Sequence, residues 1–135
     1  MNETLYILMR SDMNSMTPGK ACAQAAHAAN HAAVNMSKMG AGVDGPGFVL
    51  WQAQTDQYFG TTIVLRVTSE QQLVDMVTEA VFFGYSGDII LDPTYPVRDG
   101  DVTHLIPVHT CGWIFVGDRT DLGTNVLGIK KLPLY

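Results

Sequence analysis

Cysteine, basic charge and long apolar segments are all scarce in this sequence of 135 residues. Its two cysteines, Cys22 and Cys111, are far apart and form no CxxC motif, which is typical of a reduced, intracellular protein. No apolar run approaches the roughly 20 residues that a membrane-spanning helix needs. The first ten residues, MNETLYILMR, carry an acidic residue where a secretion signal has basic ones. We therefore expect a cytoplasmic protein without a membrane segment.

Basic residues are outnumbered, with eight lysines and arginines against 13 aspartates and glutamates and a net charge of −5. Generic binding to nucleic acid requires clustered lysine and arginine side chains. Here Lys130 and Lys131 form the only adjacent basic pair. A broad basic surface is excluded and we expect no DNA partner, although a local positive patch on an acidic body is still compatible with the sequence.

Strand-like and helix-like segments alternate along the chain, without an internal repeat or a clear linker. Apolar and β-branched runs predict strands, and apolar stripes at helical spacing predict helices. We expect a single α/β domain over residues 1–135, with helices packed against a largely parallel or mixed sheet. The expected strands are Thr4–Arg10, Thr61–Val67, Tyr85 to near Leu91, and His109–Gly117, and the expected helices are residues 18 to 36 or 39, a short one around 49–54, and 70–83.

Both long helices begin at recognisable capping residues. Thr17 can accept hydrogen bonds from free backbone N–H groups, and Pro18 suits the first helical position because it has no N–H to leave unpaired. Ser69 and Gln72 match a capping box, and Gly84 lies just past the end of the second helix. The C-terminal segment GIKKLPLY is expected to pack against the domain because it is largely apolar.

A polar stripe runs along the first helix, which otherwise consists mostly of alanine. Lys20, Gln24, His27 and His31 follow one another at intervals of four, three and four residues, so they share one helix face. Such a stripe can simply be a solvated face. However, exposed helix faces usually carry Glu, Lys and Arg, and none occurs between residues 21 and 36. We therefore expect the stripe to face a groove.

Charged residues stand where a sheet of this kind binds ligands, beyond the carboxyl ends of its strands. Lys20 lies in the first helical turn, where a cation is mildly unfavourable unless an anion binds there; the alternative is that its side chain simply extends into water. Asp92 is expected at the end of the third strand, as a base or an orienting group, or simply as a turn former before Pro93. Thr94 and Thr110 lie near the same predicted edge and alone carry little information.

Metal and cofactor sites have weak support in the sequence. His27 and His31 have the i, i+4 spacing of a metal pair, but no HExxH glutamate lies between them and no nearby residue obviously completes a tetrahedral set. The segment GAGVDGPG lacks the GK[ST] ending of a phosphate loop, and no nucleophile elbow is present. We expect no metal and no cofactor.

The segment LYILMRSDMNSMTPGKACAQAAHA, residues 5–28, resembles the opening of the type-2 peptidyl-tRNA hydrolases, the archaeal and eukaryotic type, and the likeness extends over nearly the whole chain. Their pattern is an apolar strand, Arg-x-Asp-Leu, a short turn with Met, then Gly-Lys-x-x-x-Gln-x-x-His-Ala. Downstream, the strand, Ser-capped helix and strand ending in Asp are similar too, as are a threonine before the last strand and the C-terminal end. The matching residues in the first motif are Arg10, Asp12, Met13, Met16, Gly19, Lys20, Gln24, His27 and Ala28.

This resemblance implies a four-stranded mixed sheet flanked by helices on both faces, often in a homodimer. It also implies hydrolysis of the ester that joins a peptide to the 3′ end of tRNA, by water and without a metal. The acceptor end of peptidyl-tRNA would be the partner. The implied catalytic residues are Lys20, Asp92 and Thr110, and the implied substrate-binding residues are Gly19, Gln24, His27 and Thr94.

The chain also departs from the family pattern in ways that favour an alternative. The turn before Gly-Lys is uncharged here, and the family's Ala-Gly-Arg-Thr after the aspartate is replaced by Pro93-Thr94-Tyr95-Pro96, which removes an arginine. Together with the acidic net charge, these changes support a non-catalytic binding protein that kept the fold and recognises a protein or a small anion in the same groove. The two hypotheses differ in whether Lys20→Ala abolishes turnover or only binding.

Overall fold

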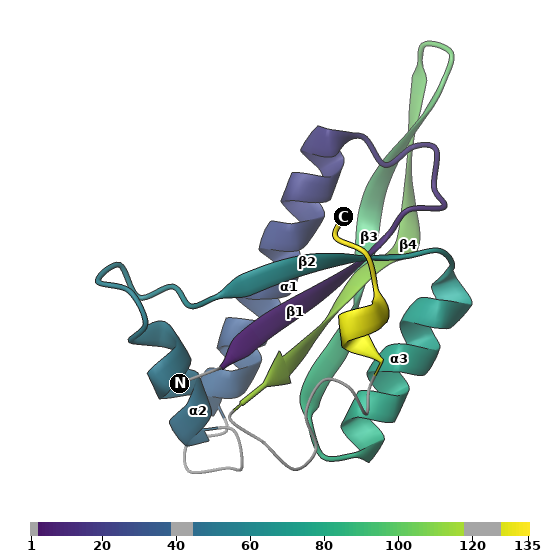
Figure 1. The fold of residues 1–135 in the computed structure, drawn as a ribbon. Helices are drawn as coiled ribbons and strands as arrows, with labels where there is room; N and C mark the ends of the chain where they lie inside the picture. The colour runs from purple at the N-terminus through teal and green to yellow at the C-terminus, as the bar shows by residue number, and fades with distance from the viewer. Residues whose placement is uncertain (1–2, 39–44, 118–127) are drawn as a thin grey trace.

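The computed structural model describes residues 3–38, 45–117 and 128–135 (Figure 1). Within these ranges the chain forms a four-stranded sheet with helices on both faces. In chain order the elements are β1 (Thr4–Arg10), α1 (Pro18–Lys38), α2 (Gly45–Gln52), β2 (Thr62–Val67), α3 (Glu70–Phe82), β3 (Ser86–Asp99), β4 (Val102–Val116) and a short 3-10 helix η1 (Ile129–Lys131).

The sheet is mixed, with the strand order β2-β1-β4-β3. β1 runs parallel to β2, and the connection between them contains α1 and α2, as parallel pairing requires a crossover. β1 and β3 both pair antiparallel with β4. This arrangement confirms the predicted α/β fold and its four-stranded mixed sheet.

Two apolar clusters, one on each face of the sheet, hold the helices in place. On one face, Ala28 and Ala32 of α1 are fully buried in a cluster with Ile7 and Trp113 of the sheet. On the other face, α3 packs through residues such as Val77 on a cluster built from the remaining strand positions. β1 therefore contributes side chains to both faces, which explains why its sequence is almost continuously apolar.

The third and fourth strands are much longer than the sequence predicts. The expected loop between Leu91 and His109 is wrong, because β3 and β4 continue through it as one long hairpin (Figure 1). Only two residues join the strands, and Gly100 among them has a φ of 60°, which glycine adopts without steric cost in a two-residue hairpin loop. Asp92 therefore lies within β3 and not at its end.

The predicted helix starts are largely confirmed. The Lys20 N–H donates to Oγ1 of Thr17 at 3.3 Å, and the Gln72 N–H donates to Oγ of Ser69 at 3.0 Å. The capping box of α3 differs in its second half, since Oε1 of Gln72 accepts from the N–H of Thr68. The short α2 begins at residue 45, four residues before the expected position.

The C-terminal tail packs against the domain, as predicted, and it does so along β2. The Arg66 N–H donates to the Pro133 carbonyl at 2.8 Å, and the Tyr135 N–H donates to the Val64 carbonyl at 3.0 Å. The tail thus covers the outer edge of β2. Among the helices of the described ranges, none has both the length and the apolar character to cross a membrane.

Candidate active site

The buried amide of Gln24 connects the first helix to the β3–β4 hairpin. Its Nε2 donates to Oδ2 of Asp92 at 2.6 Å, and its Oε1 accepts from the hydroxyl of Thr110 at 2.6 Å. Gln24 is only 3% exposed, and Thr110 is fully buried. Three residues that are distant in sequence therefore form one hydrogen-bonded chain, and its polarity is fixed because a carboxylate can only accept.

A β-bulge brings Thr110 into this chain. Ile90 pairs with Cys111 and Leu91 pairs with His109, so Thr110 is an extra residue on β4. Side chains normally alternate between the two faces of a strand, but the hydroxyl of Thr110 and the thiol of Cys111 both contact α1. The bulge therefore turns the Thr110 side chain toward the helix that carries Gln24.

Asp92 is held from a second side by Thr94. The Thr94 N–H donates to Oδ1 of Asp92 at 2.9 Å, and the Thr94 hydroxyl lies 3.4 Å from the same oxygen. Burial acts to raise the pKa of the Asp92 carboxyl. The hydrogen bonds from Gln24 and Thr94, together with the charge of His27, outweigh burial and hold this pKa below its ordinary value. Asp92 is consequently an ionised carboxylate at neutral pH.

Lys20 contacts the same strand as Asp92, but farther along it, at the Pro96 carbonyl. Its Nζ donates to the Pro96 carbonyl at 2.7 Å and sits 5.2 Å from the ring centre of Tyr95. The Tyr95 ring is fully buried, and its hydroxyl is 3.1 Å from the Ser15 hydroxyl. The structure therefore brings Lys20 to a backbone carbonyl four residues after Asp92 and leaves two of its three N–H donors for another acceptor.

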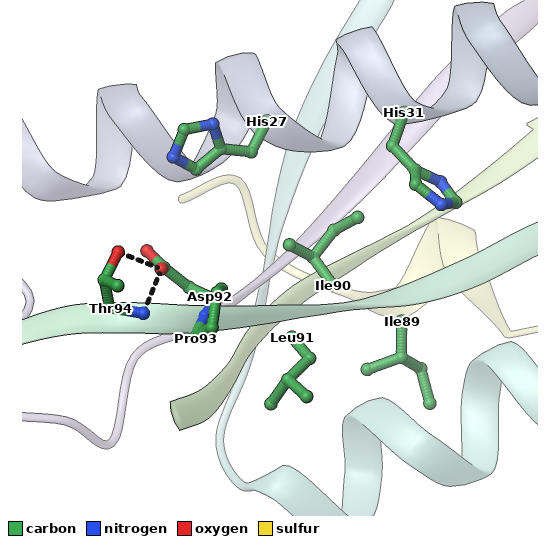
Figure 2. Close-up of a pocket in the computed structure, with 8 residues that line it drawn as sticks. All are labelled: His27, His31, Ile89, Ile90, Leu91, Asp92, Pro93 and Thr94. Carbon is green, nitrogen blue, oxygen red and sulfur yellow. Dashed lines mark hydrogen bonds between the residues drawn. The ribbon is translucent and has the colours of Figure 1, made fainter. Parts of the chain in front are cut away.

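A groove of about 530 Å³ lies between α1 and β3 (Figure 2). His27 and His31 of α1 line one wall, and six consecutive residues of β3, from 89 to 94, line the other. Of the polar stripe of α1, His27 and His31 thus line a groove, whereas Gln24 is buried and Lys20 is bonded to the Pro96 carbonyl. Gly19, at the exposed start of the same helix, has open space where a Cβ atom would be.

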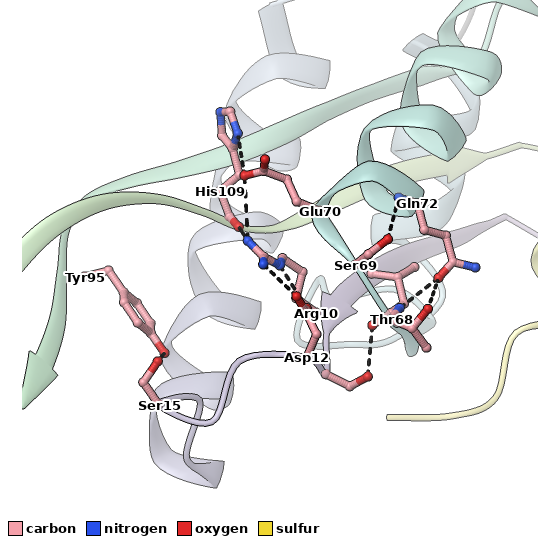
Figure 3. A network of polar contacts seen from close by, with 11 residues as sticks. Arg10, Asp12, Ser15, Thr68, Ser69, Glu70, Gln72, Tyr95 and His109 are labelled. Carbon is pink, nitrogen blue, oxygen red and sulfur yellow. Dashed lines mark hydrogen bonds and ion pairs between the residues drawn. The ribbon is translucent and has the colours of Figure 1, made fainter.

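An ion-pair network supports the hairpin on the side of β1 (Figure 3). The Arg10 guanidinium binds Asp12 through two nitrogens, at 3.0 and 2.7 Å, and donates to the His109 carbonyl at 3.0 Å. The hydrogen bond from Arg10 lowers the pKa of Asp12, against the opposing effect of burial. Because His109 directly precedes Thr110, Arg10 holds the backbone at the bulge.

The family model described as "Peptidyl-tRNA hydrolase PTH2" matches residues 4–106. The chain belongs to the peptidyl-tRNA hydrolase PTH2 family. No individual curated protein matches it. Lys20, Gln24 and Asp92 lie within the matched range, whereas Thr110 follows it, so the geometry around Gln24 is what connects Thr110 to the site.

The buried Cys111 thiol does not act as a nucleophile in this PTH2-family site. Burial raises the pKa of Cys111 to about 12, and the hydrogen bond from Thr110 lowers it only in part. The thiol donates to the Gln24 carbonyl at 3.5 Å. Because the thiolate and not the thiol is the nucleophile, Cys111 is inert at neutral pH and serves as a packing residue.

The alternative of a metal site at His27 and His31 gains no further ligands within residues 3–38, 45–117 and 128–135. Among the side chains that the structure describes, no group of three or more His, Cys, Asp or Glu could hold a metal ion. His31 is engaged otherwise, because its Nδ1 accepts from Nε1 of Trp113 at 3.0 Å and its Nε2 lies 3.6 Å from Asp88. Of the two histidines, only His27 is in the electrostatic neighbourhood of Asp92.

Sequence reasoning missed three groups around the site: the Tyr95 ring, the Pro96 carbonyl and the Arg10 network. Tyr95 and Pro96 belong to the segment that departs from the family pattern, so the pattern assigns them no role. A detectable signal was the Asp99-Gly100 pair, a strong hairpin indicator, which places Tyr95 and Pro96 on a strand beside α1. No local signal showed that Arg10 would hold His109, which is 99 residues away.

Proposed function

We propose that this PTH2-family member hydrolyses the ester between a peptide, or an N-blocked amino acid, and the 3′ end of tRNA. The observation that carries the proposal is the hydrogen-bonded chain from Thr110 through Gln24 to Asp92, at the end of the groove. The same proposal implies that the protein acts in the cytoplasm, binds the acceptor end of tRNA and forms a homodimer.

The chemistry assigns a different task to each group. Ionised Asp92 orients a water molecule and accepts its proton as the water attacks the ester carbonyl. The bond to the 3′ oxygen of tRNA then breaks, and that oxygen leaves with the proton held by Asp92. The ammonium of Lys20 stabilises the negative charge that develops on the carbonyl oxygen. Thr110 is fully buried and its hydroxyl donates a hydrogen bond to Gln24, so it positions the amide and does not touch the water. No metal or cofactor takes part in this scheme.

Substrate-binding roles fall to residues around the groove. His27 and Thr94 line it next to Asp92, and Gly19 lies at the open start of α1, where free N–H groups and the helix dipole favour an anionic phosphate or oxyanion. Gln24 would act on the substrate only through Asp92, because its amide is buried and both ends are engaged.

A non-catalytic binding protein is the second candidate. One observation favours it. The Lys20 ammonium is hydrogen-bonded to the backbone carbonyl of Pro96, in the segment that lacks the family's arginine. In that case the groove would bind its ligand without turnover.

Release of the acyl group from N-acetyl-aminoacyl-tRNA distinguishes the two functions. For the enzyme, Lys20→Ala and Asp92→Asn each lower kcat/KM by about a hundredfold, or roughly 2.7 kcal/mol of transition-state stabilisation. Lys38→Ala at the far end of α1 and Asp75→Asn on α3 are matched controls on exposed residues and keep wild-type rates. Folded wild-type protein without turnover supports the binding protein.

Salt dependence tests the tRNA component separately. If phosphates are bound, the affinity for tRNA falls steeply between low and physiological salt, because counterions are released on binding. A flat dependence contradicts tRNA recognition by this protein, whatever its activity on small esters.

A further inference from the structure

The two outer edges of the sheet differ in whether another described segment of the chain forms backbone hydrogen bonds with them. The C-terminal tail covers the edge of β2 through backbone hydrogen bonds to residues 64 and 66. β3 forms the opposite edge, and within residues 3–38, 45–117 and 128–135 no strand or tail pairs with its outer side. An edge strand that stays open can pair with another extended chain.

The open part of β3 is a short, well-defined segment. The Ile89 N–H donates to the carboxylate of its neighbour Asp88 at 2.8 Å, so it points away from β4. Since alternate residues of such a strand point their backbone groups the same way, Gly87 and Leu91 also face outward. Pro93 follows, which has no N–H, and the second bulge begins there. The regular edge therefore runs from residue 87 to residue 91.

This edge leads directly to the candidate active site. The groove of Figure 2 is lined by β3 from Ile89 to Thr94, and Asp92, with its hydrogen bond to Gln24, lies at the end where the edge stops. A chain lying along the edge therefore has one end beside the reacting groups. Leu91 is 53% exposed at this edge and offers apolar contact.

We propose that the peptidyl part of the substrate pairs with the open edge of β3 as an additional, parallel strand. Its C-terminal ester then lies at Asp92 and its preceding residues extend toward Gly87; this inference rests on the proposed function. Four extended residues span about 13 Å, the length of β3 from Asp92 back to Asp88. The carboxylate of Asp88, whose side chain is 53% exposed beside His31, suits the free amino group of a peptide of that length.

Backbone pairing matches the recognition problem that such a substrate poses. A hydrolase of peptidyl-tRNA receives peptides of any sequence, and main-chain hydrogen bonds hold an extended peptide without reading its side chains. A second copy of this chain on the same edge would instead obstruct the groove next to Asp92. That arrangement is the competing outcome of the test.

The test compares N-acetyl-alanyl-tRNA with N-acetyl-tetraalanyl-tRNA, which differ by three alanine residues and therefore in the length of backbone available for pairing. We expect kcat/KM to be at least about tenfold higher for the longer substrate, since each backbone hydrogen bond of about 1 kcal/mol contributes about fivefold. N-methylation of those alternate residues whose N–H faces β3 then lowers kcat/KM about fivefold each, whereas methylation of the intervening residues has little effect.

Failure of this inference is distinct from failure of the proposed function. If neither substrate is hydrolysed, the hydrolase proposal is wrong. If both are hydrolysed with equal kcat/KM, or if N-methylation has no two-residue periodicity, only the pairing with β3 is wrong.

A protein variant provides the matching readout. The outward Ile89 N–H is bonded to Asp88, and a pairing peptide carbonyl would replace the Asp88 carboxylate as its acceptor. Ile89→Pro removes this N–H and leaves the hydrogen bonds to β4 in place, so we expect the kcat/KM ratio between the two substrates to fall toward one. Ile89→Val is the control that keeps the ratio, and circular dichroism checks the fold of both. If light scattering shows a wild-type dimer that Ile89→Pro dissociates without changing the ratio, a second copy occupies the edge and the proposal is overturned.

Discussion

Gln24→Met tests the hydrogen-bonded centre of the site, because methionine has a similar length but neither the amide donor nor its strong acceptor. Two hydrogen bonds of 2.6 Å are lost. The bond to the carboxylate of Asp92 would be worth about 1.5–3 kcal/mol if fully buried, and the fully buried Thr110 hydroxyl is left without its acceptor at a cost of about 1–3 kcal/mol. Because Asp92 is partly exposed and water can replace one bond, we expect a total loss of about 3 kcal/mol.

Urea and thermal unfolding, followed by circular dichroism, measure this loss. For 135 residues, 3 kcal/mol corresponds to a decrease in Tm of about 10 °C. Thr110→Val alone leaves the Gln24 carbonyl unpaired and costs about 2 kcal/mol. The double variant removes both partners, so its cost falls short of the sum by about 1.5 kcal/mol.

The coupling energy between Gln24 and Thr110 decides whether the proposed hydrogen-bonded chain exists. If the costs of the two single substitutions add within about 0.5 kcal/mol, the two side chains do not interact and the proposed chain from Thr110 to Asp92 is refuted. A Gln24→Met variant of wild-type stability would refute it as well. In the acyl-release assay, the same variant is expected to lose at least about tenfold in kcat, because Asp92 loses the bond that orients it.

Three further predictions concern the supports of the site. Arg10→Met should lower the free energy of unfolding by about 2 kcal/mol in urea, because it leaves Asp12 and the His109 carbonyl without their donor; unchanged stability would contradict the network. The lowered pKa values of Asp12 and Asp92 mean that the unfolded chain binds more protons, so stability is present above about pH 4 and is lost as the pH falls through the folded pKa values. Urea unfolding at pH 7, 4 and 3 checks this, and Asp92→Asn should show a shallower loss. Gly19→Ala should keep or slightly raise Tm, because its Cβ meets open space, and a simultaneous rise in KM would indicate substrate contact there.

Much of the fold follows from local patterns that the sequence displays by itself. The apolar run of β1, the caps at Thr17 and Ser69 and the apolar periodicity of α3 each specify an element without reference to the rest of the chain. The composition of residues 92–108, with three prolines and many polar residues, is typical of a loop and does not predict the long hairpin. These residues become strands only through pairing with each other across Gly100.

In the candidate site, too, some features follow from local sequence patterns and others only from the tertiary structure. Helical periodicity alone places Lys20, Gln24, His27 and His31 on one face, because 3.6 residues per turn is a local property. Only the tertiary structure decided that Thr110 joins Gln24, since one extra residue in a β-bulge reverses the face to which a side chain points and no local pattern encodes that choice. Likewise, the open edge beside the groove exists because the tail pairs with β2 and not with β3, which depends on contacts between segments far apart in the chain.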